Sequence, residues 1–275
     1  MTIDQSTDRR GGGRRRPPPR VLEVRDVARL TPRLVSVTLG GEALTGFREP
    51  QPTAHIKLFL PDDNGHLPTP IVGADGMVDW PNGRPTMRTY TPRRYDAEAQ
   101  TLEVQVVLHG DGAASRWAER VVPGDRVAIG GPSQGLDVAS QANRWWIGGD
   151  ASAIPAVGCL VDALPATASA QVHLEVEDES EHLDLDLPLG VEVVWHDRRT
   201  PAGEQPRWGS HLLEALHAET LWPDTHVWVA CEAVAVRRIR THLLADVGHP
   251  RERVTTRGYW RLGESNHSDH DHGED

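Results

Sequence analysis

The chain has 275 residues, of which 38% are hydrophobic and 25% charged, and its formal net charge is -11. This composition is typical of a soluble protein with room for two domains, and the excess of acidic residues excludes general affinity for nucleic acid. No apolar run approaches the roughly 20 residues that span a membrane, and no signal peptide is visible, so we expect a cytoplasmic protein without a membrane partner. The cysteines Cys159 and Cys231 form no CxxC motif, which fits a reducing compartment.

The two ends of the chain have the composition of disordered segments. Residues 1–20 contain arginine, glycine and proline with almost nothing apolar, so this arm cannot bury enough surface to offset its ordering entropy. Residues 264–275 form an acidic tail that carries His267, His270 and His272. These histidines have no fixed ligand geometry, and we predict no metal site there or elsewhere.

Residues 21–138 alternate between short β-rich segments and turns. The predicted strands are Val21–Thr31, Leu34–Gly41, His55–Leu60, Met87–Tyr95, Thr101–Gly110 and Arg126–Ile129, with a long loop at 61–86 and one helix at Ser115–Val121. Six short strands at this spacing predict a closed antiparallel β-barrel.

Residues 139–263 alternate between strands and helices instead. The predicted strands are Arg144–Gly149, Gln171–Val176, Val191–His196, Thr225–Ala230 and Arg253–Arg261, and the helices are Ala153–Ala163, Ser210–Leu221 and Ala233–Val247. This alternation predicts a Rossmann-like parallel sheet that is covered by helices on both faces and binds a nucleotide. The fold class is therefore a β-barrel followed by an α/β domain.

The stretch Arg88–Arg93 combines strand chemistry with cation chemistry. Arg88 and Arg93 offer guanidinium groups to a phosphate, Tyr90 offers a ring for stacking, and Thr91 offers a hydroxyl. Such a set suits a large planar ligand that carries a pyrophosphate. An ordinary barrel strand with solvated arginines explains the same residues equally well.

A second stretch, His109–Trp117, ends a strand, passes two glycines and starts a helix. Gly112, Ala113, Ala114 and Ser115 are small, so the free N–H groups of the helix N-terminus are open to a pyrophosphate. The alternative is a common strand-to-helix turn that is capped by Ser115.

Three further candidates lie where strands of the α/β half end. Asp150 and Ser152, in the first strand-to-helix turn, either cap the helix or contact a nucleotide, although the GxGxxG fingerprint is absent. Glu232 either stabilises a helix N-terminus or orients a carboxamide or ribose. Tyr259 and Trp260 either cover a planar cofactor or close the sheet.

Together these motifs make the chain resemble the siderophore-interacting protein family, which comprises FAD-dependent ferric-siderophore reductases related to ferredoxin–NADP reductase. The resemblance covers residues 20–263 and rests on Arg88–Arg93, His109–Trp117 and Gly258–Gly263. It implies that FAD is held by the following residues: Arg88, Tyr90, Thr91, Arg93, His109, Gly112, Ala113, Ala114, Ser115 and Trp117. It also implies that Asp150, Ser152, Ala153, Glu232, Tyr259 and Trp260 lie near the cofactors, with Ala151 in place of the glutamate usual in the family.

The resemblance further implies a substrate site. Lys57 and Arg261 match two basic residues that hold anionic ferric siderophores in some members, whereas Ser133 stands in the turn that usually carries a third. We therefore expect a less charged siderophore, such as a hydroxamate or a mixed-ligand compound.

By the same resemblance, electrons pass from NAD(P)H through FAD to Fe(III), and the flavin carries the chemistry without a catalytic side chain. Glu175, Glu177 and Asp178 near the end of the second α/β strand favour a ribose hydroxyl over a 2′-phosphate, which tilts the expected donor slightly towards NADH. Two alternatives remain: a flavoprotein fed by ferredoxin, and a non-catalytic siderophore carrier. We expect a monomer.

Overall fold

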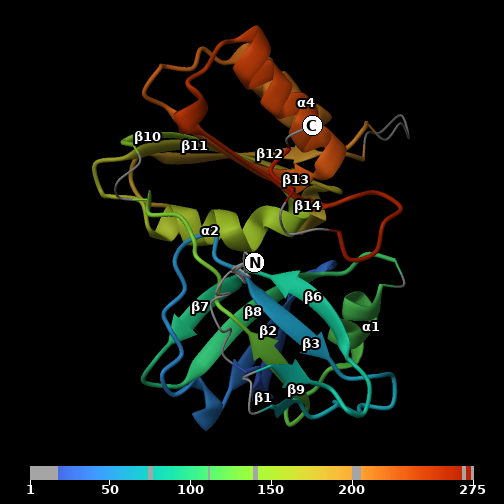
Figure 1. Ribbon diagram of the computed structural model, residues 1–275. Helices are drawn as coiled ribbons and strands as arrows, with labels where there is room; N and C mark the ends of the chain where they lie inside the picture. The colour runs from blue at the N-terminus through green and yellow to red at the C-terminus, as the bar shows by residue number, and fades with distance from the viewer. Residues whose placement is uncertain are drawn as a thin grey trace, which may run out of the picture.

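The computed structural model describes residues 18–73, 77–110, 112–138, 142–199, 206–267 and 271–273. An antiparallel sheet from the N-terminal half lies below a parallel sheet from the C-terminal half (Figure 1). This arrangement confirms the expected fold class. In the part of the chain that the structure describes, no helix has the length and apolar character needed to cross a membrane.

The antiparallel sheet has seven strands, where six were expected. In the order β6-β3-β9-β1-β2-β8-β7, they are β6 (Thr86–Tyr90), β3 (Ile56–Leu60), β9 (Arg126–Gly130), β1 (Arg20–Thr31), β2 (Leu34–Gly40), β8 (Thr101–Val107) and β7 (Pro92–Asp96). The additional strand arises because the segment predicted as one strand is divided at Thr91 into β6 and β7. These two strands form the opposite edges of the sheet, so a single residue links the edges and the sheet curls into a barrel.

The barrel core follows the period-2 pattern of its strands. Val37 and Leu39 of β2, with Ile56 and Leu58 of β3, have no exposed surface. Helix α1 (Ala113–Arg120) packs Ala114, Trp117 and Ala118 against the same core. It begins two residues before the predicted start.

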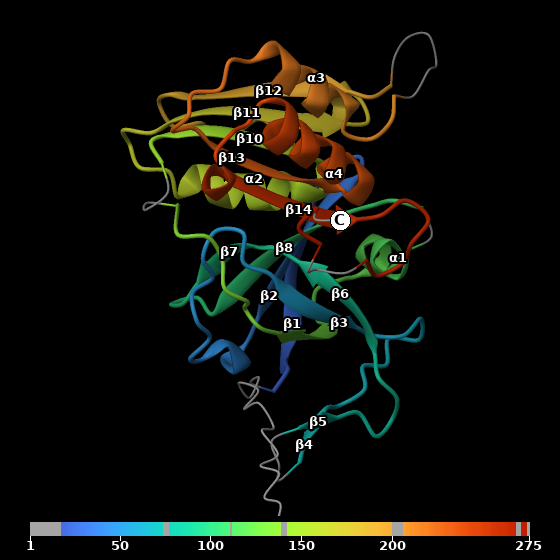
Figure 2. The ribbon, with the colours of Figure 1, turned by 45° about the horizontal axis from the view of Figure 1, so that its top comes forward.

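The long loop at 61–86 contains a small two-stranded sheet of β4 (Ile71–Val72) and β5 (Val78–Asp79). Figure 2 shows these strands extending away from the barrel. Ring packing between Trp80 and Phe59, with centroids 5.2 Å apart, and an ion pair between Arg120 and Asp63 at 3.0 Å fasten the base of the extension to the body.

The parallel sheet has five strands in the order β12-β11-β10-β13-β14. They are β10 (Arg144–Asp150), β11 (Ser169–Val176), β12 (Val191–Asp197), β13 (His226–Glu232) and β14 (Val254–Trp260). Helix α2 (Ile154–Asp162) covers the face towards the barrel (Figure 1), and α3 (Ser210–Ala218) and α4 (Ala233–Thr241) cover the other (Figure 2). The predicted helix at Ala233–Val247 continues beyond α4 as a π-helical turn over His242–Asp246.

The two halves share buried surface. Leu34 and Val107 of the barrel belong to the same apolar cluster as the side chains of α2. A buried hydrogen bond from Thr31 Oγ1 to Glu181 Oε2, 2.5 Å long, adds a polar contact. Side chains of β2, β8 and α2 pack together across this boundary, and a hydrogen bond also joins the two halves. Packing therefore defines how the halves are oriented.

The ends of the chain are more ordered than expected where the structure describes them. Residues 1–17 of the predicted arm lie outside the described residues, but Arg20 already belongs to β1 and donates to the carbonyl of Thr45 at 3.0 Å. In the tail, the backbone carbonyl of Asp271 accepts from Gly258 N–H at 2.9 Å, and its carboxylate pairs with Arg237 at 3.1 Å. The described part of the tail therefore covers the outer edge of β14.

Candidate functional site

The site lies where the carboxyl edge of the parallel sheet meets the bend between β6 and β7. Strand β10 has β11 on one side and β13 on the other, so the strand order reverses there, and ligands of such sheets bind at this position. The side chain of Thr91 lies beside the hydroxyl of Tyr259, near the end of β14, and opposes the rise that burial causes in the pKa of that hydroxyl. This contact brings two of the predicted motifs together.

Arg88 and Tyr90 lie on the face of β6 that looks towards the barrel core. In the antiparallel register Arg88 is opposite Leu58 and Tyr90 is opposite Ile56, both core residues. Burial raises the pKa of the Tyr90 hydroxyl, and the nearby Arg88 charge only partly opposes this. The Arg88 guanidinium donates to the carbonyl of Met87 at 2.9 Å, and no described carboxylate forms an ion pair with it. Its charge is therefore available to an anionic ligand.

The loop from His109 to Ser115 is closed by one side chain. The Ser115 hydroxyl accepts from the His109 N–H and donates to the His109 carbonyl, both at 3.0 Å. Gly112 is the N-cap residue of α1 and no side chain caps this helix. Ser115 therefore shapes the loop, whereas the expected capping role is not observed.

The first turn of α1 fits the pyrophosphate of a dinucleotide such as FAD. The first N–H groups of a helix lack intrahelical partners, and the residues that carry them here are Ala113 and Ala114. No side chain caps this turn, and a Cβ atom on Gly112 would only make ordinary contact with the His109 ring, at 3.5 Å. With Arg88 on the face of β6 towards the same core, backbone donors and a guanidinium are available on one side of the barrel.

Two residues assigned to the flavin by resemblance have other contacts. Arg93 pairs with Asp162 of α2 at 2.6 Å, and its guanidinium lies against Gly158. Trp117 is 2% exposed and belongs to the barrel core. Because these contacts lie within the protein, the assignment of the two residues to the flavin stays a prediction.

Asp150 occupies the centre of the carboxyl edge. Its carboxylate, 1% exposed, accepts from the Ser152 N–H at 3.0 Å, the Ser152 hydroxyl at 2.5 Å and the Trp260 indole N–H at 2.7 Å. Burial raises its pKa, and these hydrogen bonds oppose the rise. Ala153 is fully buried beneath the same turn. Asp150 thus holds the turn and Trp260 in place.

Glu232 caps helix α4. One carboxylate oxygen accepts from Val234 N–H at 2.8 Å and Ala235 N–H at 2.9 Å, and the other accepts weakly from Leu262 N–H at 3.4 Å. The capping interpretation accounts for the first two contacts, and the third joins Glu232 to the segment that follows β14. Trp260 packs edge-on against Trp208, with ring centroids 4.9 Å apart, and the sequence analysis did not identify Trp208. No spacing rule connects these two tryptophans, because they meet only in the folded sheet.

The expected substrate residues have partners within the protein. Lys57 Nζ donates to Thr89 Oγ1 at 2.7 Å, and Arg261 pairs with Glu264 at 3.2 Å. At the turn that lacks the third basic residue, Ser133 accepts from His55 N–H at 2.8 Å. Arg48 donates to the Ser133 carbonyl at 3.3 Å, so a guanidinium from elsewhere in the barrel lies at this turn.

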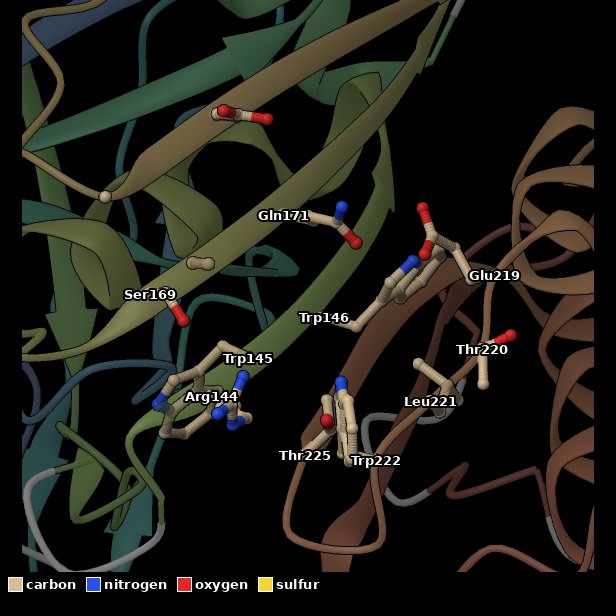
Figure 3. Close-up of a pocket in the computed structure, with 13 residues that line it drawn as sticks. Arg144, Trp145, Trp146, Ser169, Gln171, Glu219, Thr220, Leu221, Trp222 and Thr225 are labelled. Atoms are coloured by element: carbon tan, nitrogen blue, oxygen red, sulfur yellow. The ribbon is translucent and has the colours of Figure 1, made fainter.

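A separate pocket opens at the opposite, amino-terminal edge of the parallel sheet (Figure 3). It has a volume of about 430 Å³, and its lining includes Arg144, Trp146, Glu219 and Trp222. None of the predicted site residues lines it. Elsewhere in the described residues, no group of histidine, cysteine, aspartate and glutamate side chains is arranged to hold a metal ion.

Comparison with known proteins gives a consistent family. Residues 23–136 match the model of the siderophore-interacting FAD-binding domain, and residues 142–263 match that of the siderophore-interacting protein. The ferric vibriobactin reductase ViuB of Vibrio cholerae is 31% identical over 92% of this chain and 93% of its own. The NADPH-dependent ferric-chelate reductase of Escherichia coli is 31% identical over 88% of this chain and 92% of its own. The crystal structure of a siderophore utilization protein from T. fusca, 35% identical, superposes with a TM-score of 0.79 over 92% of this chain and 96% of that chain.

Proposed function

This chain belongs to the siderophore-interacting protein family, and we propose that it is a flavin-dependent reductase that passes electrons from a nicotinamide nucleotide to Fe(III) held by a siderophore. The observation that carries the proposal is the contact between Thr91 and Tyr259. It joins the barrel motif that carries Arg88 to the nucleotide edge of the parallel sheet. The names of the two bacterial reductases above support the same activity.

When bound, FAD supplies the redox chemistry, accepting a hydride and passing on single electrons. The protein supplies position and electrostatics. Arg88 and the first turn of α1 would hold the pyrophosphate, and Tyr90 would support the ring system. The shared apolar cluster between the halves excludes water from the boundary beside the site. A hydride carries one proton with its two electrons, so transfer of the electrons to two Fe(III) ions would release one proton, which can pass to solvent without a catalytic side chain.

Iron release follows from the chemistry of the metal. Hard oxygen donors bind Fe(III) more tightly than the larger and less charged Fe(II), so reduction loosens the complex. We propose Lys57 and Arg261 as the contacts to the siderophore. Ser133 stands where a basic residue is usual, and the only guanidinium described at this turn, that of Arg48, is engaged by the Pro132 and Ser133 carbonyls. We therefore propose a hydroxamate or mixed-ligand siderophore as the substrate.

The donor is a nicotinamide nucleotide. The expected preference for NADH rested on Glu175, Glu177 and Asp178. Glu175 is fully buried and accepts from Gly209 N–H at 2.8 Å and His211 N–H at 3.2 Å. It therefore cannot reach a ribose. Glu177 and Asp178 both pair with Arg199. None of the three carboxylates is therefore held ready for a ribose hydroxyl, and the expected preference for NADH loses its physical basis.

Absorption spectroscopy of the purified protein, followed by anaerobic reduction, tests the proposal. We expect flavin bands that bleach on addition of NADPH or NADH and return on addition of a ferric siderophore, with Fe(II) trapped by a chromogenic chelator. A colourless protein that binds the ferric complex would indicate a carrier. Flavin that is reduced by ferredoxin but by neither nucleotide would indicate a ferredoxin-fed electron-transfer protein.

A further inference from the structure

We propose that the pocket at the amino-terminal edge of the parallel sheet binds a small amine that carries an aromatic ring and an acceptor oxygen, such as a phenolic hydroxyl (Figure 3). This edge is opposite the one that meets the bend between β6 and β7, so the pocket is separate from the candidate flavin and nucleotide site. The proposal does not rest on the proposed function, because it concerns side chains that take no part in electron transfer.

The floor of the pocket consists of five side chains on neighbouring strands. The parallel register sets Arg144 of β10 opposite Ser169 of β11. Two residues further along, Trp146 is opposite Gln171, which is opposite Glu192 of β12. Side chains two residues apart on a strand share a face, and here it is the face of α3 and α4, because Trp146 belongs to their apolar cluster. The floor is therefore mostly polar, although it continues into a core.

The segment that connects α3 to β13 forms the wall. Glu219 and Trp222 line the pocket from this segment (Figure 3). Trp222 is 63% exposed, and the guanidinium carbon of Arg144 lies 5.6 Å from the centroid of its ring. An exposed indole of this kind offers a large apolar surface on which a ring or a cation can stack.

Trp146 supplies a hydrogen-bond donor that lacks an acceptor. The residue is 1% exposed, and its Nε1–H has no hydrogen-bond partner among the described residues. Its six-membered ring lies over Gly148, where an added Cβ would be 2.5 Å from Cζ3. The Nε1 edge is therefore turned back towards the amino-terminal end of the strand, and Figure 3 shows it directed towards Glu219. Because buried indole N–H groups are normally hydrogen-bonded, this one indicates that a ligand brings an acceptor atom.

The charges of the pocket favour a cation. Arg144 pairs with Asp224 at 3.5 Å, so its charge is balanced within the protein. Glu192 of the floor and Glu219 of the wall form no ion pair within the described part of the chain. An ammonium group would find these two carboxylates, and the face of Trp222 would add a cation–π contact.

These features together define the class of ligand. The volume of about 430 Å³ lies in the range of pockets that hold small organic molecules. An amine with a phenol ring provides the cation for the carboxylates, the ring for Trp222 and the oxygen for Trp146. A second nucleotide does not suit the pocket, because its phosphates would be repelled by Glu192 and Glu219.

Isothermal titration calorimetry with tyramine tests the proposal on the purified protein, whatever its flavin content. We expect saturable binding at one site with a Kd of about 10–100 μM. Phenethylamine, which lacks the oxygen, should bind about tenfold more weakly. The compound 3-(4-hydroxyphenyl)propionate, which has a carboxylate in place of the ammonium, should give no measurable binding. The absence of saturable tyramine binding up to about 5 mM, or equal binding of the propionate, would overturn the proposal.

The variant Trp146→Phe isolates the indole donor, because it keeps an aromatic ring against His173 and removes the N–H group. Tyramine should bind to it about tenfold more weakly than to the wild type, while phenethylamine should bind as before. An equal loss of affinity for both ligands would be a packing effect and would contradict the contact with Trp146.

Glu219→Gln and Trp222→Ala change the wall without touching the core. Each should weaken tyramine binding by about 3- to 10-fold, and circular dichroism confirms that the variants are folded. Glu98→Gln is the matched control, because Glu98 is an exposed carboxylate on the turn between β7 and β8 of the barrel. If both wall variants bound tyramine as tightly as Glu98→Gln, the ligand would lie elsewhere and the proposal would be wrong.

Discussion

Arg93 of strand β7 donates a hydrogen bond of 2.6 Å to Asp162 of helix α2, and this ion pair joins the barrel to the parallel-sheet half. The Arg93 side chain is only 14% exposed, while that of Asp162 is 57% exposed. The guanidinium is covered by α2 at Gly158, where any side chain would collide with it. Arg93 thus serves the interface, although it lies five residues from the arginine proposed to bind the cofactor.

The first prediction tests whether Arg93 stabilises the interface between the halves and does not bind the cofactor. Arg93→Ala should lower the free energy of unfolding by about 1–2 kcal/mol, because it leaves a cavity beside Gly158 and removes a partly buried ion pair. It should retain its flavin. Urea denaturation and the ratio of flavin to protein absorbance measure the two effects. A variant of normal stability that has lost flavin would reassign Arg93 to the cofactor.

The second prediction concerns Arg88. Arg88→Ala should weaken FAD binding by about 10- to 100-fold, because the pyrophosphate loses a charge-assisted hydrogen bond, while the apoprotein keeps its stability. Arg88→Lys should restore part of the affinity, since lysine keeps the charge but not the paired donors. Reconstitution of the apoprotein with FAD, followed by fluorescence, gives the dissociation constants. Full retention of flavin in Arg88→Ala would contradict the proposed cradle.

The third prediction concerns pH. The His173 ring is stacked between Trp146 and His196, with centroid distances of 4.9 Å and 5.3 Å, and its Nδ1 lies 3.0 Å from His196 Nε2. Burial, followed by the neighbouring His196, lowers the pKa of His173 from 6.5 to about 4. The unfolded chain therefore takes up a proton more readily than the folded protein. The contribution of His173 to the free energy of unfolding is fully present above pH 6.5 and is lost as the pH falls towards 4.

Between pH 6.5 and pH 4, the free energy of unfolding falls by about 3 kcal/mol because of His173. His173→Phe should keep the stacking and flatten the pH dependence of the free energy of unfolding, as measured by urea denaturation at pH 7.5, 6 and 5. His66→Phe serves as the control, because His66 is exposed. If wild type and His173→Phe lost stability in parallel between pH 7.5 and 5, another group would be responsible.

The fourth prediction separates the two interpretations of Glu232. Glu232→Ala should lower the free energy of unfolding by about 1–2 kcal/mol, because the Val234 and Ala235 N–H groups lose their acceptor. Glu232→Gln retains an acceptor oxygen, so its stability and its KM for the donor should stay near those of the wild type. A raised KM in a fully stable Glu232→Gln would show that the carboxylate contacts the nucleotide.

Local patterns were enough to predict most of the fold. Strand β13 is buried on both faces, with Val227 and Val229 packed towards α3 and α4 and Trp228 and Ala230 towards α2, as its continuous apolar sequence predicts. The break at Thr91 did not follow, because the irregular register between Pro92 and Arg94 depends on pairing with β8. The packing of Asp271 on Gly258 was also invisible, since a polar tail carries no periodic signal.

The candidate site was predictable only in its parts. The glycine and alanine residues before α1 and the arginine of β6 were identified from residue type and position. The charges near the end of β11 were misjudged, because Glu177 was considered without Arg33, which precedes it by more than a hundred residues. Similarly, Asp150 and Trp260 lie at opposite ends of the α/β half and meet through one 2.7 Å hydrogen bond. Long-range ion pairs and hydrogen bonds of this kind have no local sequence signature.

The shared apolar cluster has a practical consequence for anyone who dissects the protein. Leu34, Val107 and Val138 complete the core of the C-terminal half although they precede the parallel sheet in the chain. A fragment that begins after residue 138 would therefore expose the barrel-facing side of α2, and a fragment that ends there would expose these three side chains. Both fragments would expose apolar surface and would tend to aggregate. Chimeras that exchange one half between relatives would need these contact residues transplanted together with it.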